Sequence, residues 1–152
     1  MDSYQRLRER ARQLFDENPL ITCPYCPEPV VLNAEGVHHL RYSAERERSK
    51  PEQMLKFRLL PLALEVVRKS GTVQEYRRIW QAVGKRGADG MRAAKEVEYW
   101  GFVAIIGPRP VKIRVILRRV GTGNITLCSV MRGSKILRDG SQRLSPENLE
   151  AD

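Results

Sequence analysis

The sequence has few of the residues and segments that define secreted and membrane proteins. It contains three cysteines in 152 residues, an odd number that argues against the disulfide framework of a secreted domain. No apolar run approaches the ~18 residues that a membrane-spanning helix requires. The N-terminal segment is charged and lacks the apolar stretch of a signal peptide. We therefore expect a soluble, cytoplasmic protein with no membrane partner.

Acidic residues are missing from one long segment. The chain has 27 Lys and Arg against 18 Asp and Glu, a net charge of +9. Residues 99–138 hold 8 basic residues and no acidic one, so nearly all of the excess charge falls there. Surfaces that need charge only for solubility mix both signs, whereas an uncompensated cationic block attracts polyanions. The pattern favours contact with RNA or another nucleic acid over an anionic membrane, because the segment is not an amphipathic helix.

Apolar spacing predicts helices in the first half of the chain. Residues 2–17 carry apolar side chains at helical spacing. A second helix should cover 51–70, with a kink or break before Pro61, which lacks an N–H donor. Residues 72–75 match a capping box, so a third helix is expected over 73–83.

The apolar period changes to two at residue 99, as is typical of strands. Strands are expected over 99–106, 111–120 and 124–131, with a hairpin turn between the last two. Helices followed by consecutive strands indicate an α+β fold, with N-terminal helices packed on a C-terminal antiparallel β-meander.

The chain is expected to divide into three parts. Residues 1–29 form an N-terminal helix and a cysteine-bearing knuckle, and residues 30–133 form a single α+β domain. Residues 134–152 are polar and are expected to be a flexible tail.

The expected hairpin places several polar side chains on one face of the sheet. If Thr122 and Gly123 form the turn, Arg118 lies opposite Leu127 and Ile116 lies opposite Ser129. One face then carries Lys112, Arg114, Arg118 and Ser129, and the core face carries Val115, Leu117, Cys128 and Val130. Such a polar face can be a solvated outer surface or a phosphate-binding surface. We favour the second, with Arg41 and Arg119 as further candidate nucleic-acid-binding residues, because every charge on the face is positive.

The chain has only two histidines, His38 and His39, in a segment expected to form a short helix over 35–42. Adjacent helical residues point about 100° apart, so at most one of them reaches a given site. Histidine titrates near neutral pH and suits general acid–base catalysis. The alternative is a packed or solvated pair with no chemical role.

The motif Cys23-Pro24-Tyr25-Cys26 has the spacing of half a zinc site. A structural zinc would need two more ligands, which one of the histidines and Cys128 or a water could supply. The same motif is similar to the active-site sequence of glutaredoxins, but the prolines that follow resist the helix that lowers the thiol pKa there. A pair without a ligand is the third alternative. A likeness to HNH nucleases is weak because the helix after the histidines has no second metal-binding His.

The order of these features resembles the barnase/EndoU/colicin/RelE-like ribonuclease superfamily, in particular its phage and mobile-element branches. The resemblance covers about residues 30–132. It rests on VVLNAEGVHHLRY, FRLLPLALEVV, YRRIW and the meander GFVAIIGPRPVKIRVILRRVGTGNITLCSVM.

The resemblance implies an endoribonuclease that requires no metal. His38 or His39 would act as base or acid, Arg41, Arg114 and Arg118 would hold the phosphate, and Ser129 would orient it. The sequence departs from the group because the expected sheet contains no carboxylate, which excludes a glutamate base there. The group also implies an acidic antitoxin or immunity protein as a partner of such a toxin.

Two other functions compete with the nuclease. One is a nucleic-acid-binding module without catalysis, in which Cys23 and Cys26 belong to a zinc knuckle. The other is an interaction protein of a mobile element, whose basic sheet binds an acidic protein. The nuclease needs no cofactor, so stoichiometric zinc would favour the module.

Overall fold

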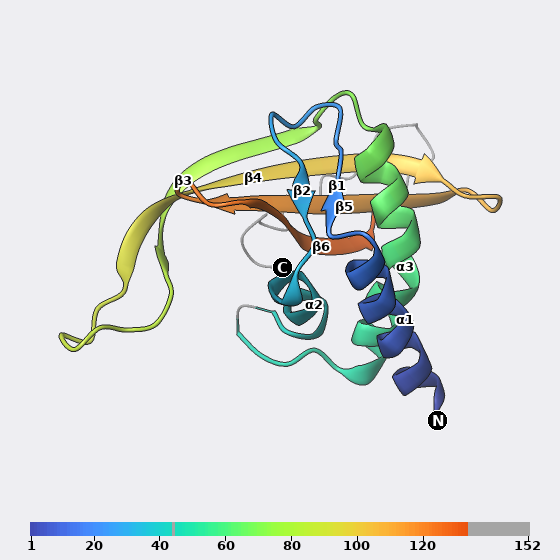
Figure 1. Cartoon of the computed structure of the whole chain (residues 1–152), viewed down its shortest axis with the longest axis horizontal. Helices are drawn as coiled ribbons and strands as arrows, with labels where there is room; N and C mark the ends of the chain where they lie inside the picture. Colours follow the sequence, from blue (N-terminus) through green and yellow to red (C-terminus); the bar gives the residue numbers. More distant parts are fainter. Residues whose placement is uncertain (44, 134–152) are drawn as a thin grey trace, which may run out of the picture.

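Helices come first and strands form most of the second half of the chain (Figure 1). The computed structural model describes residues 1–43 and 45–133, and the tail expected at 134–152 lies outside the described residues. The elements are α1 (Ser3–Glu17), β1 (Leu20–Ile21), β2 (Val30–Val31), α2 (Ala34–Arg41), α3 (Lys50–Lys69), β3 (Glu75–Val83), β4 (Ala93–Ile106), β5 (Val111–Val120) and β6 (Ile125–Arg132). This order confirms the α+β class.

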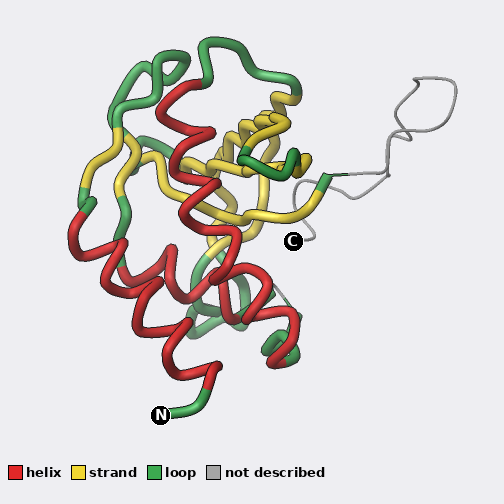
Figure 2. The backbone as a smooth tube through the Cα atoms, turned by 90° about the vertical axis from the view of Figure 1, so that its right-hand side faces the viewer, coloured by secondary structure: helices red, strands yellow, loops and turns green. Residues whose placement is uncertain are grey.

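The strands form one six-stranded sheet in the order β1-β2-β6-β5-β4-β3. β3 to β6 are a meander of antiparallel neighbours, and only the short β2–β6 pairing is parallel. α3 packs against one face of this sheet and α1 packs on α3, whereas α2 packs beside β6 (Figure 2). β2 pairs only with the first two residues of β6, so the later part of β6 has no neighbour on that side among the described strands.

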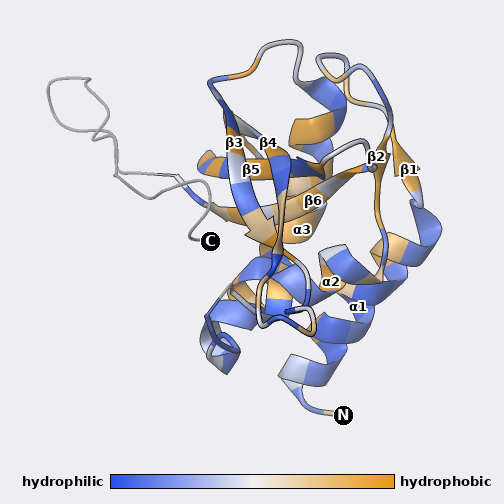
Figure 3. Ribbon diagram, turned by 90° about the vertical axis from the view of Figure 1, so that its left-hand side faces the viewer, coloured by the Kyte–Doolittle hydropathy of each residue, from blue (hydrophilic) through white to orange (hydrophobic). Residues whose placement is uncertain are grey.

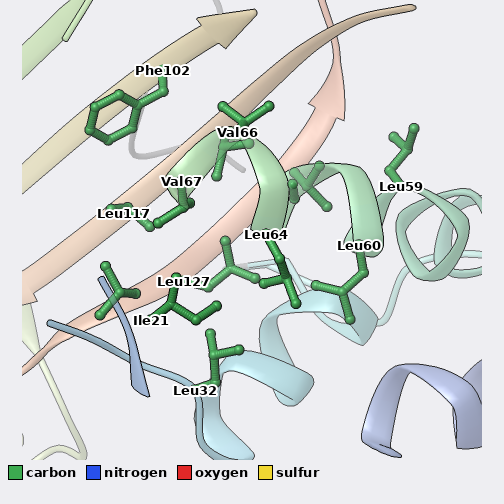
Figure 4. Packing of buried hydrophobic residues seen from close by; sticks show 14 of the residues in the cluster. Ile21, Leu32, Leu59, Leu60, Leu64, Val66, Val67, Phe102, Leu117 and Leu127 are labelled. Atoms are coloured by element: carbon green, nitrogen blue, oxygen red, sulfur yellow. The ribbon is translucent and has the colours of Figure 1, made fainter. Parts of the chain in front are cut away.

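The main core lies between α3 and the sheet. Leu60, Leu64 and Val67 of α3 are buried with Phe102 of β4 and Leu117 of β5 (Figure 4). α1 packs on α3 and adds further buried side chains to the same core, while most of its own surface is hydrophilic (Figure 3). A second, smaller group of buried residues lies on the other face of the sheet, and its members are Val97, Tyr99, Ile116 and Cys128.

The expected break at Pro61 does not occur, because α3 runs through it without interruption. The proline is exposed, so its ring faces solvent and the carbonyl that it leaves without a donor can be hydrated. On the opposite side, Leu60, Ala63 and Leu64 are almost fully buried. Burial of apolar side chains before and after the proline in the sequence outweighs the loss of one helix hydrogen bond.

The helix expected over 73–83 is wrong, because residues 75–83 form the edge strand β3. The apolar residues of this segment fit either period, since Tyr76, Ile79, Trp80 and Val83 are spaced as on a helix while Ile79 and Val83 also share one strand face. Nine consecutive residue pairs with β4 fix the strand. These long-range backbone hydrogen bonds override the local helical pattern.

The expected register of β5 and β6 holds for only part of the hairpin. Ile116 lies opposite Ser129 as expected, but Leu117 lies opposite Leu127 and Arg118 opposite Thr126. An irregularity between these pairs leaves Cys128 as an extra residue of β6. Cys128, expected in the main core, therefore lies in the second group of buried residues on the other face.

None of the described helices is both long enough and apolar enough to cross a bilayer.

Candidate active site

A cavity of about 300 Å³ lies between α2 and the face of the sheet opposite α3. We call it the histidine cavity, and the lining residues that matter here are His38, His39, Gln81, Tyr99, Arg118 and Cys128. They come from α2 and from four strands of the sheet. The fold thus brings both histidines to the same cavity as Arg118, an arginine of the cationic segment.

The position of α2 depends on how its N-terminus meets the sheet. The Asn33 side chain caps the helix by accepting a hydrogen bond from the Gly36 amide. A side chain at Gly36 would place its Cβ atom 2.7 Å from the Phe15 ring, so only glycine permits this close approach. Leu40 is fully buried in the main core. With Leu40 turned into the core, the preceding His39 faces the cavity on the other side of β6.

His39 is the better placed of the two histidines for proton transfer. Its Nε2 atom is buried and lies 3.6 Å from a carboxylate oxygen of Glu35, one helical turn earlier. Burial lowers the pKa of His39, and the nearby positive charge of Arg118 lowers it further, against a smaller opposing effect of Glu35. A histidine whose pKa lies below the ordinary value is neutral at pH 7 and can accept a proton.

His38 lies at the outer part of the cavity. Its ring stacks on Tyr42, with ring centroids 4.4 Å apart and planes tilted by 13°. The centroids of the two histidine rings are 6.3 Å apart. The side chain is exposed, so His38 can exchange protons with solvent while it still borders the same space as His39.

Two arginines border the cavity, the exposed Arg92 and the more buried Arg118. The Nε atom of Arg118 is buried and has no hydrogen-bond partner in the described part of the chain. The guanidinium carbon lies 5.9 Å from the centroid of the Tyr99 ring, and the Tyr99 hydroxyl donates to Gln81 at 2.7 Å. A buried donor without a partner is costly, so the arrangement suits an anion that accepts from Arg118.

A second cavity, of about 390 Å³, adjoins the first. Val83, Gly84 and Arg118 line both cavities. The second cavity also has polar groups from Lys95, Asn124 and other residues. The two cavities therefore meet at Arg118, and the carboxylate of Glu35 also lines the second one.

Two of the expected catalytic residues are held by other side chains. Arg114 is bound through two hydrogen bonds of 2.8 Å to Glu75 of β3. Ser129 is fully buried and accepts a hydrogen bond from Lys56 of α3 at 3.2 Å. Neither residue lines the histidine cavity. The expectation that the sheet contains no carboxylate is wrong, because β3 contributes Glu75 and β4, which begins at Ala93 and not at residue 99, contributes Glu96 and Glu98.

The other basic residues expected at the site are dispersed. Arg119 lies on the opposite face from Arg118 and donates to Glu98 at 2.7 Å. Arg41 contacts Glu47 and Gln53, outside the cavity. Lys112 lies at the other end of β5, where its aliphatic chain would meet any side chain at Gly133. Strand alternation explains why Arg119 faces away from Arg118.

The cysteine pair lies in the loop between β1 and β2, where a turn closes with a hydrogen bond from the Cys26 amide to the Cys23 carbonyl. Cys23 belongs to the main core, whereas Cys128 is on the other face of the sheet. Across residues 1–43 and 45–133 the structure holds no group of three or more His, Cys, Asp or Glu side chains that could bind a metal. The two cysteines therefore have no third protein ligand of these types there.

Several residues of the site were not predicted from the sequence. Tyr99 comes from β4. Gln81 comes from β3, a segment for which the apolar spacing predicts a helix. Glu35 had a local signal, because it precedes His39 by four residues on a helix. Comparisons with family models, curated proteins and solved structures found no match to this chain.

Proposed function

We propose that the protein is an endoribonuclease that cleaves RNA by attack of the 2′-hydroxyl on the adjacent phosphate, with no metal in the reaction. The observation that carries the proposal is the pairing of His39 with Arg118 in one cavity. The buried Nε of Arg118 lacks a partner among the described residues, and His39 beside it has a lowered pKa. This combination offers a base and an anion-binding group at the same place.

In the proposed reaction, His39 removes the proton of the 2′-hydroxyl. The 2′-oxygen forms a bond to phosphorus, the bond from phosphorus to the 5′-oxygen breaks, and a 2′,3′-cyclic phosphate results. His38, which borders the same cavity, gives a proton to the departing 5′-oxygen. Arg118 stabilises the negative charge that builds up on the phosphate oxygens. Glu35 orients the His39 ring, which makes Glu35 a positioning residue.

The adjoining cavity supports a substrate larger than a single phosphate. Its polar lining and the Arg118 side chain that it shares with the histidine cavity suit a nucleotide next to the cleaved bond. The proposed partner of such an enzyme is an acidic antitoxin or immunity protein, which would block the reaction by covering both cavities.

The test is cleavage of total RNA in excess EDTA by the wild-type protein and by matched arginine variants. Arg118→Ala should reduce the cleavage rate by about 100-fold or more, as expected for loss of a group that stabilises transition-state charge. Arg119→Ala removes the same charge from the next residue, which faces the other side of the sheet, and should reduce the rate by less than about tenfold.

His39→Ala and His38→Ala complete the test, and the products should carry cyclic phosphate ends. Equal effects of the two arginine variants would show that only general electrostatic attraction is involved. Absence of cleavage by the wild-type protein, at protein concentrations well above that of the RNA, would refute the proposal.

A further inference from the structure

The outer ends of β3 and β4 and the loop between them project away from the part of the sheet that the helices cover (Figure 1). We call residues 77–95 the arm. Every residue from 84 to 92 is exposed, and Gly84 and Gly90 have positive φ angles that only glycine adopts easily. The arm is therefore a defined hairpin with most of its tip in contact with solvent.

The arm is strongly basic. It contains six Lys and Arg residues and one acidic residue, Asp89. The cations at and near the tip are Lys85, Arg86, Arg92 and Lys95. All four are exposed. An excess of positive charge on a projecting hairpin attracts a polyanion and disfavours a basic or neutral protein partner.

The arm also exposes a large aromatic side chain. Trp80 is 73% exposed, whereas Trp100 of β4, which packs in the core, is only 4% exposed. Tyr76, four residues earlier on the same face of β3, is 49% exposed. Its hydroxyl donates to Glu98 at 2.7 Å, which fixes the ring. Trp80 lies opposite Glu96 of β4, which pairs with Arg78, and the four tip cations lie farther along the arm. Exposed rings followed by cations are features that bind unpaired bases by stacking.

The arm begins at the proposed active site. Gly84 and Arg92 border the histidine cavity, and Lys95 borders the adjoining one. Gln81 points into the histidine cavity, so its neighbour Trp80 lies on the opposite face of the same strand. β3 is the last of the described strands in the sheet, so at this edge the two faces are separated by β3 alone. A single-stranded RNA that leaves the cavity at this edge would therefore reach the face that carries Trp80.

We infer that the arm is a second binding element for single-stranded RNA, in which Trp80 stacks on a base and the basic tip contacts the phosphates. This inference rests on the proposed function and adds the substrate class, namely RNA with unpaired nucleotides beside the cleaved bond. A stacked base has no requirement for sequence, so the arm contributes affinity with little base preference.

The probe is a 2′-O-methyl oligouridine, which cannot undergo 2′-hydroxyl attack, so binding is measured without cleavage. The arm contains the exposed tryptophan and the core contains the buried one, which makes intrinsic fluorescence specific for the arm. Binding should quench the wild-type fluorescence. Trp80→Phe should bind within a few-fold of wild type but show no quenching, because only Trp100 remains. Trp80→Ala should bind about fivefold to 100-fold more weakly, the range for loss of one stacked base.

Ile105→Ala is the control, because Ile105 is an exposed apolar residue (59% exposed) at the other end of β4. This variant should bind the oligouridine as the wild-type protein does. A duplex of the same length should bind more weakly than the single strand. The inference would be overturned by unchanged affinity of Trp80→Ala or by quenching in Trp80→Phe. It would also be overturned if the duplex bound equally well or if the protein preferred an acidic peptide. Cleavage of total RNA separates the two proposals: binding at Trp80 without cleavage refutes only the nuclease, and cleavage unaffected by Trp80→Ala refutes only the arm.

Discussion

Arg114 of β5 and Glu75 of β3 form a two-point ion pair across β4, with Nε and Nη2 each 2.8 Å from a carboxylate oxygen. Gly101 of β4 lies between them in the sheet, and a Cβ atom there would be 3.0 Å from the Cβ of Glu75. The missing side chain leaves room for Glu75 to reach Arg114. The pair thus fastens the edge strand to the interior of the sheet and neutralises the cation that the sequence suggested for phosphate binding.

Glu75→Gln should therefore destabilise the protein. The Arg114 side chain is only 11% exposed, so loss of its partner leaves a largely buried charge with a weaker acceptor. We expect the free energy of unfolding to fall by about 1–3 kcal/mol, measured by urea denaturation. Glu96→Gln is the control, because its partner Arg78 is 61% exposed and such pairs contribute less than about 1 kcal/mol. Equal losses in the two variants would contradict a special role for the buried pair.

The same pair shows why the fold could be predicted further than the site. Local patterns were enough for α1 and for the strands of the β5–β6 hairpin, because their apolar spacing fits one period only. Residues 75–83 fit two periods, and only pairing with β4 decides between them. The pairing of Arg114 could not be predicted without this strand, because its partner Glu75 comes from 39 residues earlier in the chain.

Some of the residues that line the histidine cavity could be predicted from the sequence. The histidines and Arg118 stood out by residue type and charge, and the structure places them around one cavity. The bulge that shifts Cys128 and the alternation that turns Arg119 away have no local signal strong enough to predict them. Residue chemistry identified the candidates, and the tertiary structure decided which of them meet.

His39 should titrate below the ordinary histidine pKa of about 6.5. Burial and the charge of Arg118 both lower its pKa. Arg118→Gln removes one of these causes, so the titration of His39 should move to higher pH in NMR spectra. The signal is assigned by comparison with His38→Ala, since the chain has only two histidines. An unchanged His39 titration in Arg118→Gln would show that the two side chains do not interact.

The sign of the His39 shift also sets a pH dependence of stability. The unfolded chain takes up a proton near pH 6.5, while the folded chain resists it until the pH is lower. The free energy of unfolding should therefore decrease as the pH falls below about 6.5. His39→Gln should lose less stability than wild type between pH 7 and pH 5, roughly the window in which histidine titrates. Urea denaturation at several pH values measures both proteins, and parallel curves would contradict the lowered pKa.

Cys23 should be a thiolate at neutral pH. A hydrogen bond from Cys26 and two backbone amides lower the pKa of Cys23 to about 6, against the effect of burial, and the same contact raises the pKa of Cys26. The ultraviolet absorbance of the thiolate should titrate near pH 6 in the wild-type protein. Cys26→Ala removes the strongest donor, so the titration should move towards the ordinary thiol pKa. Cys128→Ala is the control and should leave this low-pH step in place.

Ser129 offers a direct contrast between a structural and a catalytic role. Its hydroxyl accepts from the buried Lys56 ammonium, which also donates to the Val130 carbonyl at 2.8 Å. Ser129→Ala removes one of these acceptors but leaves the backbone one, so the free energy of unfolding should fall by about 1–3 kcal/mol. Because Ser129 does not border the histidine cavity, the RNA cleavage rate at a temperature where the variant is folded should stay within a few-fold of wild type. Removal of a group that contacts the transition state reduces the rate about 100-fold. A loss of that size in a folded Ser129→Ala protein would show that Ser129 belongs to the active site and that Arg118 is not its central residue.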